Sequence, residues 1–267
     1  WRHHVAEALS YSLTLWIDTA FGAVGILSLT WFWHDAVTGA FGAAFRLFEG
    51  LCSMSAVLFL VLLPEVAARH ALAPERVAPL VSRAMSYTTL LVLPLTAGLL
   101  VEAPLLVRAL FGPGYGEAVL PLRILSLSFL GIFTTEITCT VLWAVARPRA
   151  VLGLMAARLV AQIACALWLV PLGGAVGASL ALCLSAGIGW ALSWFLLRRC
   201  GVPWPQLRLV AGIGLTASAV FAALVGLQAI PWPVRLGVAC FGGLVVAHVL
   251  RIITAADLQL VRTLPAQ

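Results

Sequence analysis

The sequence contains no lysine, and only 10% of its residues carry a charge, against 63% that are hydrophobic. Soluble domains carry about 25% charged residues, which form the surface that faces water. With a mean hydropathy of +1.08, this chain has too few charges to build such a surface. The net charge of +6 comes from arginine alone. Because the arginines lie mainly between apolar runs, they indicate membrane topology, and we expect no nucleic-acid partner.

The sequence also lacks the spacings that mark metal sites and catalytic sites. Its six cysteines lie mostly inside apolar runs, and its five histidines form no ligand cluster. It has no glycine-rich phosphate loop, nucleophile elbow or His-Glu-x-x-His motif. We therefore expect no catalytic residues, no metal and no cofactor, and the protein is predicted not to be an enzyme.

Long apolar runs occur along the whole chain, each long enough to cross a hydrocarbon core of about 30 Å as a helix. They lack the alternation of lipid-facing strands, which excludes a closed β-barrel. The sequence predicts an all-α, polytopic transmembrane helix bundle. We place about eight spans at 9–31, 39–63, 84–101, 119–144, 151–169, 175–197, 209–230 and 234–253. The third is the weakest prediction, because Pro94 interrupts it.

The arginines between these spans fall mainly on one side of the predicted bundle. Positively charged loops stay on the cytoplasmic side of a membrane. The sequence therefore predicts a multi-pass protein of the inner, cytoplasmic membrane with both ends of this segment in the cytoplasm. The arginines assigned to that side are Arg2, Arg69, Arg76, Arg83, Arg147, Arg149, Arg198, Arg199, Arg208, Arg251 and Arg262, against Arg108, Arg123 and Arg235 on the other.

Ionisable residues inside the first two spans form the first candidate site. Asp18 lies in the first span, and Arg46 and Glu49 lie in the second, at comparable predicted depth. Two interpretations are open. The charges neutralise one another in a structural ion pair, Arg46 with Glu49 or with Asp18. Alternatively, Arg46 lines a cavity and binds an anionic substrate, since guanidinium matches phosphate oxygens.

Glu136 and Arg158 form a second candidate pair. They lie at similar distances before and after the Arg147-Pro148-Arg149 turn, so an antiparallel hairpin brings them to the same depth. We expect them to lie near each other. The pair either locks two helices together, which its pattern favours, or lines a cavity.

Several short motifs resemble bacterial flippases of the multidrug/oligosaccharidyl-lipid/polysaccharide (MOP) superfamily. The runs 42–49 (Gly-Ala-Ala-Phe-Arg-Leu-Phe-Glu) and 62–66 (Leu-Leu-Pro-Glu-Val) resemble one helix of that family. Four further segments resemble family motifs and come in the family's order: an external loop at 110–115, a cytoplasmic turn at 146–149, a turn at 171–178 and an acidic-leucine tail at 256–260. The loop and the cytoplasmic turn are similar to those of Wzx-like polysaccharide exporters, and lipid II flippases are related.

The resemblance implies a MATE-like transporter with two lobes. Residues 1–200 would be the C-terminal lobe with six transmembrane helices, and residues 201–267 two additional helices and a short cytoplasmic tail. Since the chain begins with Trp1 and not with methionine, we expect it to be the C-terminal portion of a longer protein, whose N-terminal lobe is a partner.

The resemblance further implies that the protein flips a lipid-linked oligosaccharide or polysaccharide precursor, of polyprenyl diphosphate type, across the bacterial cytoplasmic membrane by alternating access. Arg46 would engage the diphosphate, with Glu49 and Asp18 beside it. One alternative is a drug or metabolite exporter of the same superfamily, with Asp18 and Glu136 accepting a cation. Another is a membrane-embedded glycosyltransferase or ligase, for which Glu102 and Glu117 are the externally placed acids.

Overall fold

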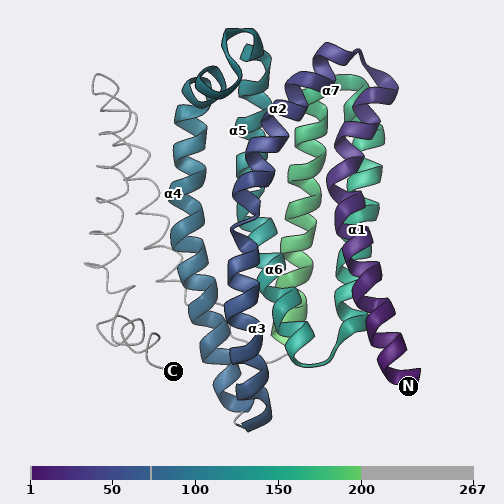
Figure 1. Ribbon diagram of the computed structural model, residues 1–267, viewed down its shortest axis with the longest axis vertical. Helices are drawn as coiled ribbons and strands as arrows, with labels where there is room; N and C mark the ends of the chain where they lie inside the picture. Colours follow the sequence, from purple (N-terminus) through teal and green to yellow (C-terminus); the bar gives the residue numbers. More distant parts are fainter. Residues whose placement is uncertain (1, 73, 200–267) are drawn as a thin grey trace.

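The computed structural model describes residues 2–72 and 74–199, and these form a bundle of helices with no strand among them (Figure 1). The predicted all-α class is thereby confirmed for this part of the chain. The predicted spans at 209–230 and 234–253, and the second predicted unit at 201–267, lie outside the described residues. The helices are α1 (Arg2–Phe32), α2 (Asp35–Cys52), α3 (Ser55–Leu72), α4 (Val77–Phe111), α5 (Val119–Leu127), α6 (Phe129–Ala144) and α7 (Pro148–Arg199), with 3-10 turns η1 (Pro74–Arg76) and η2 (Pro113–Ala118).

Four stretches of the described chain are long and apolar enough to cross a membrane as helices: Tyr11–Phe32, Asp35–Leu72, Val77–Phe111 and Pro148–Arg199. A fifth arises if Pro113–Leu127 and Phe129–Ala144, which meet at a 42° bend, are counted as one span. The protein is therefore a multi-pass membrane protein, as its composition predicted.

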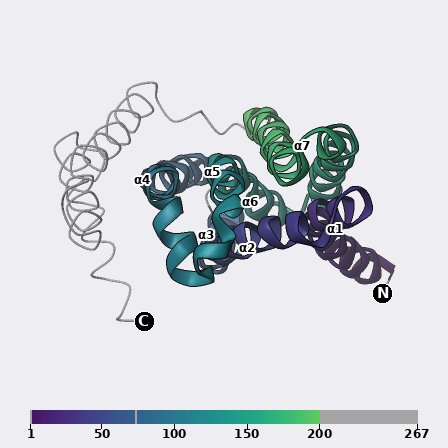
Figure 2. The ribbon, with the colours of Figure 1, turned by 90° about the horizontal axis from the view of Figure 1, so that it is seen from above.

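The 52-residue α7 is a hairpin in which the chain reverses at Gly174. Gly174 has a φ of +52°, which side chains with a Cβ rarely adopt, so glycine permits the reversal. Seen from above, the two halves of α7 lie side by side next to α1 (Figure 2). The indole Nε1 of Trp33, in the α1–α2 turn, donates a 2.8 Å hydrogen bond to the carbonyl of Val170. This bond joins the α1–α2 turn to the reversal.

Two of the predicted spans are wrong in their boundaries. The third span, placed at 84–101, is too short at both ends, because it lies within the 35-residue α4, which continues through both Pro94 and Pro104. Proline is tolerated inside transmembrane helices where neighbouring groups satisfy the freed carbonyls. The second span is broken in the middle, between Cys52 and Ser55. The Ser53 hydroxyl donates to the Gly50 carbonyl at 2.6 Å there, and such local bonds bend helices.

Close backbone approach holds α6 against the second half of α7. A Cβ added to Gly131 would lie 2.6 Å from the carbonyl oxygen of Ala186, so glycine is required at this crossing. Nearby, the buried Ser185 hydroxyl donates to Gln162 Oε1 at 2.7 Å and joins the two halves of α7. Small residues and interhelical hydrogen bonds are the usual means of association between helices in lipid.

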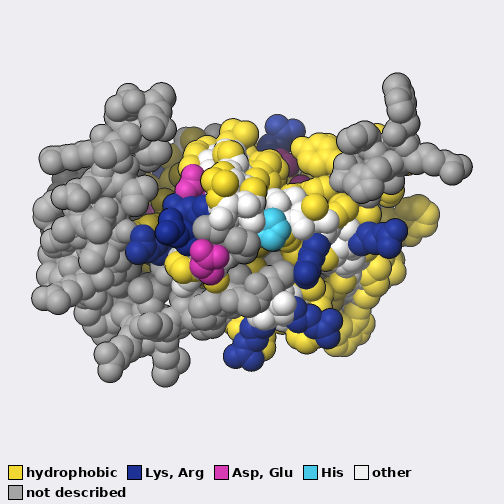
Figure 3. Space-filling view, turned by 90° about the horizontal axis from the view of Figure 1, so that it is seen from below, with side chains coloured by type: hydrophobic (Ala, Val, Ile, Leu, Met, Phe, Trp, Pro, Cys, Tyr) yellow, Lys and Arg dark blue, Asp and Glu magenta, His cyan; other side chains and the backbone are white. Residues whose placement is uncertain are grey.

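Arginine side chains gather at one end of the bundle (Figure 3). This end carries the α3–α4 connection, the α6–α7 turn and the end of α7 (Figure 1). Arg198 stacks on the ring of Trp194 with 3.9 Å between the guanidinium carbon and the ring centroid, a contact typical of arginine beside aromatic residues. The arginines assigned to one side by sequence on these elements thus share one end of the structure. Which side of the membrane this end faces stays a prediction.

Candidate substrate pocket in the helix bundle

A pocket of about 420 Å³ lies between α1, the broken α2–α3 helix, α6 and α7. Small-molecule sites commonly measure about 300–1,000 Å³ and combine an apolar wall with a few polar groups. This pocket follows that pattern, because aromatic and aliphatic side chains make up most of its wall. Its ionisable side chains other than tyrosine and cysteine are Asp18, Glu49, Glu136 and Arg158.

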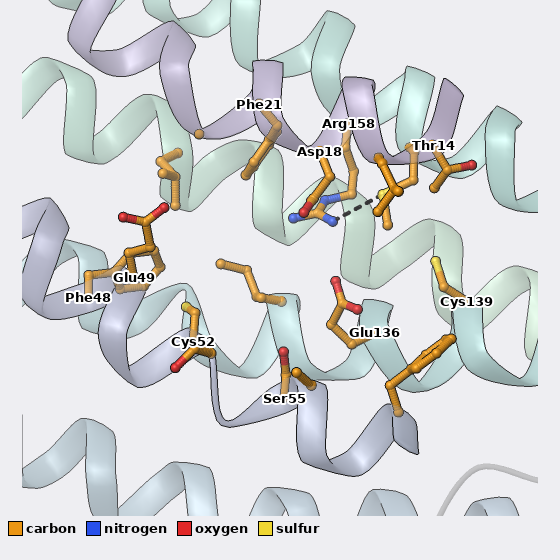
Figure 4. Close-up of a pocket in the computed structure, with 18 of the residues that line it drawn as sticks. Thr14, Asp18, Phe21, Phe48, Glu49, Cys52, Ser55, Glu136, Cys139 and Arg158 are labelled. Carbon is orange, nitrogen blue, oxygen red and sulfur yellow. Dashed lines mark hydrogen bonds between the residues drawn. The ribbon is translucent and has the colours of Figure 1, made fainter. Parts of the chain in front are cut away.

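Arg158 is held in the wall of this pocket by packing (Figure 4). Its side chain is 2% exposed, and its guanidinium carbon lies 4.4 Å from the centroid of the Phe21 ring. Nη1 donates to the sulfur of Met155 at 3.5 Å, while Nε has no hydrogen-bond partner among the described residues. A Cβ on Gly189 would lie 2.7 Å from Arg158 Cδ. Gly189 therefore leaves the space through which the arginine stem passes.

Three carboxylates share the pocket with this one guanidinium. Asp18 on α1 and Glu49 on α2 are exposed, whereas Glu136 on α6 is half-buried. Figure 4 shows Asp18 and Arg158 on the same wall of the pocket and Glu136 pointing into it from α6. No ion pair within 4.0 Å joins Arg158 to Asp18 or Glu136 in the described structure. The site is thus an acidic pocket with an unpaired buried cation and not a closed salt bridge.

The break between α2 and α3 forms one side of the pocket. Cys52, Ser53 and Ser55, which flank or form the break, all line it. The α-helix is interrupted between Cys52 and Ser55, at the wall of the pocket. The break is therefore part of the pocket wall.

The residues predicted from sequence are only partly brought together. Glu136 and Arg158 line one pocket, as the hairpin geometry predicted, and Asp18 and Glu49 join them. Arg46 does not line this pocket; it is exposed on the outer face of α2, and no ion pair joins it to Asp18 or Glu49 in the described chain. The interpretation of Arg46 as half of a structural ion pair is thus wrong for this structure. Its role toward substrate stays a prediction.

Sequence reasoning missed Phe21, Gly189 and the α2–α3 break as parts of the site. The signal for the break was present, since Gly50, Ser53 and Ser55 fall within a few residues. Nothing in the sequence indicated that Gly189 faces Arg158 from the other half of a hairpin. Of the acids considered for an enzyme, Glu102 is not in an external loop but buried in α4, and Glu117 is exposed in η2.

Metal ligands do not cluster in the described ranges, where no group of three histidine, cysteine, aspartate or glutamate side chains is placed to hold an ion. The described part of the chain is thus a helix bundle of membrane-spanning length and composition, with an acidic, aromatic pocket between its helices.

Solved structures of transporters share this fold. Lipid II flippase MurJ, in an inward closed conformation, superposes with a TM-score of 0.75 at 13% identity over 92% of this chain. A MOP superfamily transporter from Pyrococcus furiosus gives 0.67 at 17% identity over 91%. An outward-facing multidrug resistance MATE family transporter gives 0.60 at 16% identity over 91%. The three structures are those of a flippase and two transporters, and the likeness confirms the predicted MATE-like fold.

The chain spans 52% of the flippase and 62% of each of the other two chains. No family model matches the sequence, and no curated protein matches it. The likeness therefore shows the fold alone. Sequence identities of 13%, 17% and 16% do not indicate that this chain moves the same substrate as any of the three.

Proposed function

We propose that this chain is the C-terminal lobe of a flippase that moves a lipid-linked oligosaccharide or polysaccharide precursor across the bacterial cytoplasmic membrane. The observation that carries the proposal is the pocket, which places Asp18, Glu136 and Arg158 inside a membrane-embedded bundle with the transporter fold. Ionisable groups in a bilayer are costly, and they usually face a substrate or ion pathway. A pocket with a mainly apolar wall and four charged side chains, inside a membrane-embedded bundle, suits a substrate whose head is polar and whose tail stays in lipid.

In this proposal an N-terminal lobe completes the transporter, and rocking of the two lobes exposes the substrate alternately to each side. The exposed face of α2 would turn toward that lobe. It carries Gly39, Gly42, Arg46 and Glu49 in one helical stripe, and a Cβ added to either glycine would meet nothing within 4 Å. Arg46 would bind the diphosphate from this open face, because guanidinium forms paired hydrogen bonds with phosphate oxygens.

The test is export of glycan by the full-length protein carrying Arg46→Ala. We expect lipid-linked glycan to accumulate on the cytoplasmic side and export to fall at least tenfold. Arg69→Ala is the matched control: Arg69 is a partly exposed arginine paired with Glu65 at 2.6 Å, at the end of α3 and outside the pocket. Full export by the Arg46→Ala protein at normal abundance would overturn the assigned role.

The acidity of the pocket favours one second candidate, a drug or metabolite exporter that takes organic cations. Aromatic faces and carboxylates attract a cation together. For that function, removing Glu136 and Asp18 would sensitise cells to cationic drugs and leave glycan export unchanged. Drug sensitivity measured beside glycan export in the same variants separates the two.

A further inference from the structure

The pocket offers ring faces and hydrogen-bond acceptors on the same wall. Six aromatic side chains line it, from α1, α2, α3 and α6: Tyr11, Phe21, Phe45, Phe48, Phe59 and Trp143. Aromatic side chains supply large, rigid apolar contact surfaces, and ionised carboxylates accept several hydrogen bonds each. A ligand that matches both has a compact ring with apolar faces and a rim of hydroxyl groups. A sugar unit has this chemistry.

Arg158 supplies the donors that such a ligand also needs. Its side chain is 2% exposed, its Nε has no partner among the residues described, and the head lines the pocket. A guanidinium carries five N–H donors, and among residues 2–72 and 74–199 the only hydrogen bond found for this one is the weak contact of Nη1 with the Met155 sulfur. Buried donors are normally paired, by protein, water or ligand. Ring, hydroxyl and carbonyl oxygens of a sugar would satisfy them.

The charge of the wall decides which sugars fit. Carboxylates outnumber the guanidinium three to one in this pocket. An anionic group placed among them is repelled, and the repulsion is stronger in a partly buried pocket than in water. The same repulsion disfavours a diphosphate inside the pocket. Arg46 is exposed about one helical turn before Glu49, which lines the pocket, so a diphosphate bound by Arg46 would lie next to a sugar in the pocket.

We infer that this pocket is a sugar-binding subsite that accepts a sugar without an acidic group and rejects uronic acids and other anionic sugars. The inference rests on the proposed function, since it places the first sugar beside the diphosphate. Asp18, Glu49 and Glu136 accept from its hydroxyls and Arg158 donates to its oxygens. The carboxylates set the selectivity against negative charge.

Equilibrium binding to the purified full-length protein tests this with two probes that differ in one group. Both are short-chain prenyl diphosphates, one bearing N-acetylglucosamine and the other glucuronic acid. We expect the neutral probe to bind at least tenfold more tightly. Glu136→Gln should reduce this ratio to threefold or less by weakening the repulsion. Glu49→Gln, at an exposed position, should also lower the ratio of the two affinities. It replaces the Glu136 variant in the test if that variant does not fold.

Arg46→Ala separates the inference from the function on which it rests. It should weaken both probes by the same factor and leave their ratio unchanged. Equal binding of the two probes, or a ratio that survives both carboxylate substitutions, would overturn the inference while the flippase proposal stands. If neither probe binds the wild-type protein but ethidium does, the flippase proposal fails, and the sugar subsite fails with it.

Discussion

Substitution of Gly189 by alanine tests whether the arginine stem is held as the structure shows. The added Cβ would lie 2.7 Å from Arg158 Cδ and 3.0 Å from both Cγ and Nε. Favourable carbon contacts lie at about 3.5–4.0 Å. The overlap is therefore about 1 Å, against a stem that is buried on all sides. Overpacking of this kind costs about 1–3 kcal/mol.

Gly187→Ala is the matched control, since it lies on the same half of α7 and its added Cβ would meet nothing within 4 Å. Alanine is favoured over glycine inside a helix by about 1 kcal/mol, and this gain applies to both variants. The difference between them thus isolates the contact with Arg158. We expect Gly187→Ala to be at least as stable as the wild type and Gly189→Ala to be less stable than Gly187→Ala by about 1–3 kcal/mol.

The assay is unfolding of the full-length protein in detergent, followed by circular dichroism across a denaturant series. Binding of the neutral sugar probe is measured on the same preparations, because a displaced Arg158 head should weaken it. Equal stability of the two alanine variants would show that the stem of Arg158 does not pass Gly189, and the description of the pocket wall would then be incorrect.

Three further substitutions test the packing that surrounds the pocket. Gly131→Ala should destabilise the protein by about 1–3 kcal/mol, because the new Cβ meets a backbone carbonyl at 2.6 Å that cannot rotate away; unchanged unfolding would contradict the close crossing of α6 and α7. Ser185→Ala should lower the free energy of unfolding by about 1 kcal/mol, because it removes the hydrogen bond to Gln162. Combining it with Gln162→Leu in a double-mutant cycle should restore part of that stability. Trp33→Phe should lower the free energy of unfolding by about 0.5–1.5 kcal/mol, because it removes the hydrogen bond to the Val170 carbonyl of α7. Faster proteolytic cleavage at the α1–α2 turn would show this loss.

Composition and hydropathy were sufficient to predict the class of this protein. A chain with 10% charged residues and repeated apolar runs can satisfy its backbone in lipid only as helices or a closed barrel, and the runs lacked strand alternation. Helix ends were harder to predict: the third span, placed at 84–101, extends over Val77–Phe111 as α4, and local serine bonding breaks the second span. Both outcomes depend on which groups lie next to the helix in the folded bundle, and the hydropathy pattern of the sequence does not contain that information.

The sequence also predicted which charges lie inside the bilayer, and the hairpin argument brought Glu136 and Arg158 to one pocket. It did not decide which way each charge points around its helix. Arg46 and Glu49 are three residues apart on α2, yet only Glu49 lines the pocket. That difference is set by the rotation of α2 against α6 and by the break that follows it.

The sequence by itself determined that this chain is a membrane-embedded helix bundle. Its few charges cannot form a water-facing surface, and in lipid its backbone N–H and C=O groups must be paired within helices. Only the tertiary structure decided that Arg158 is a buried cation without an ion-pair partner among the described residues, facing three acids in a cavity. That outcome depends on contacts between residues distant in sequence. Phe21 and Gly189 come from separate helices, and they fix the arginine where side-chain pattern alone allowed either an ion pair or an open site.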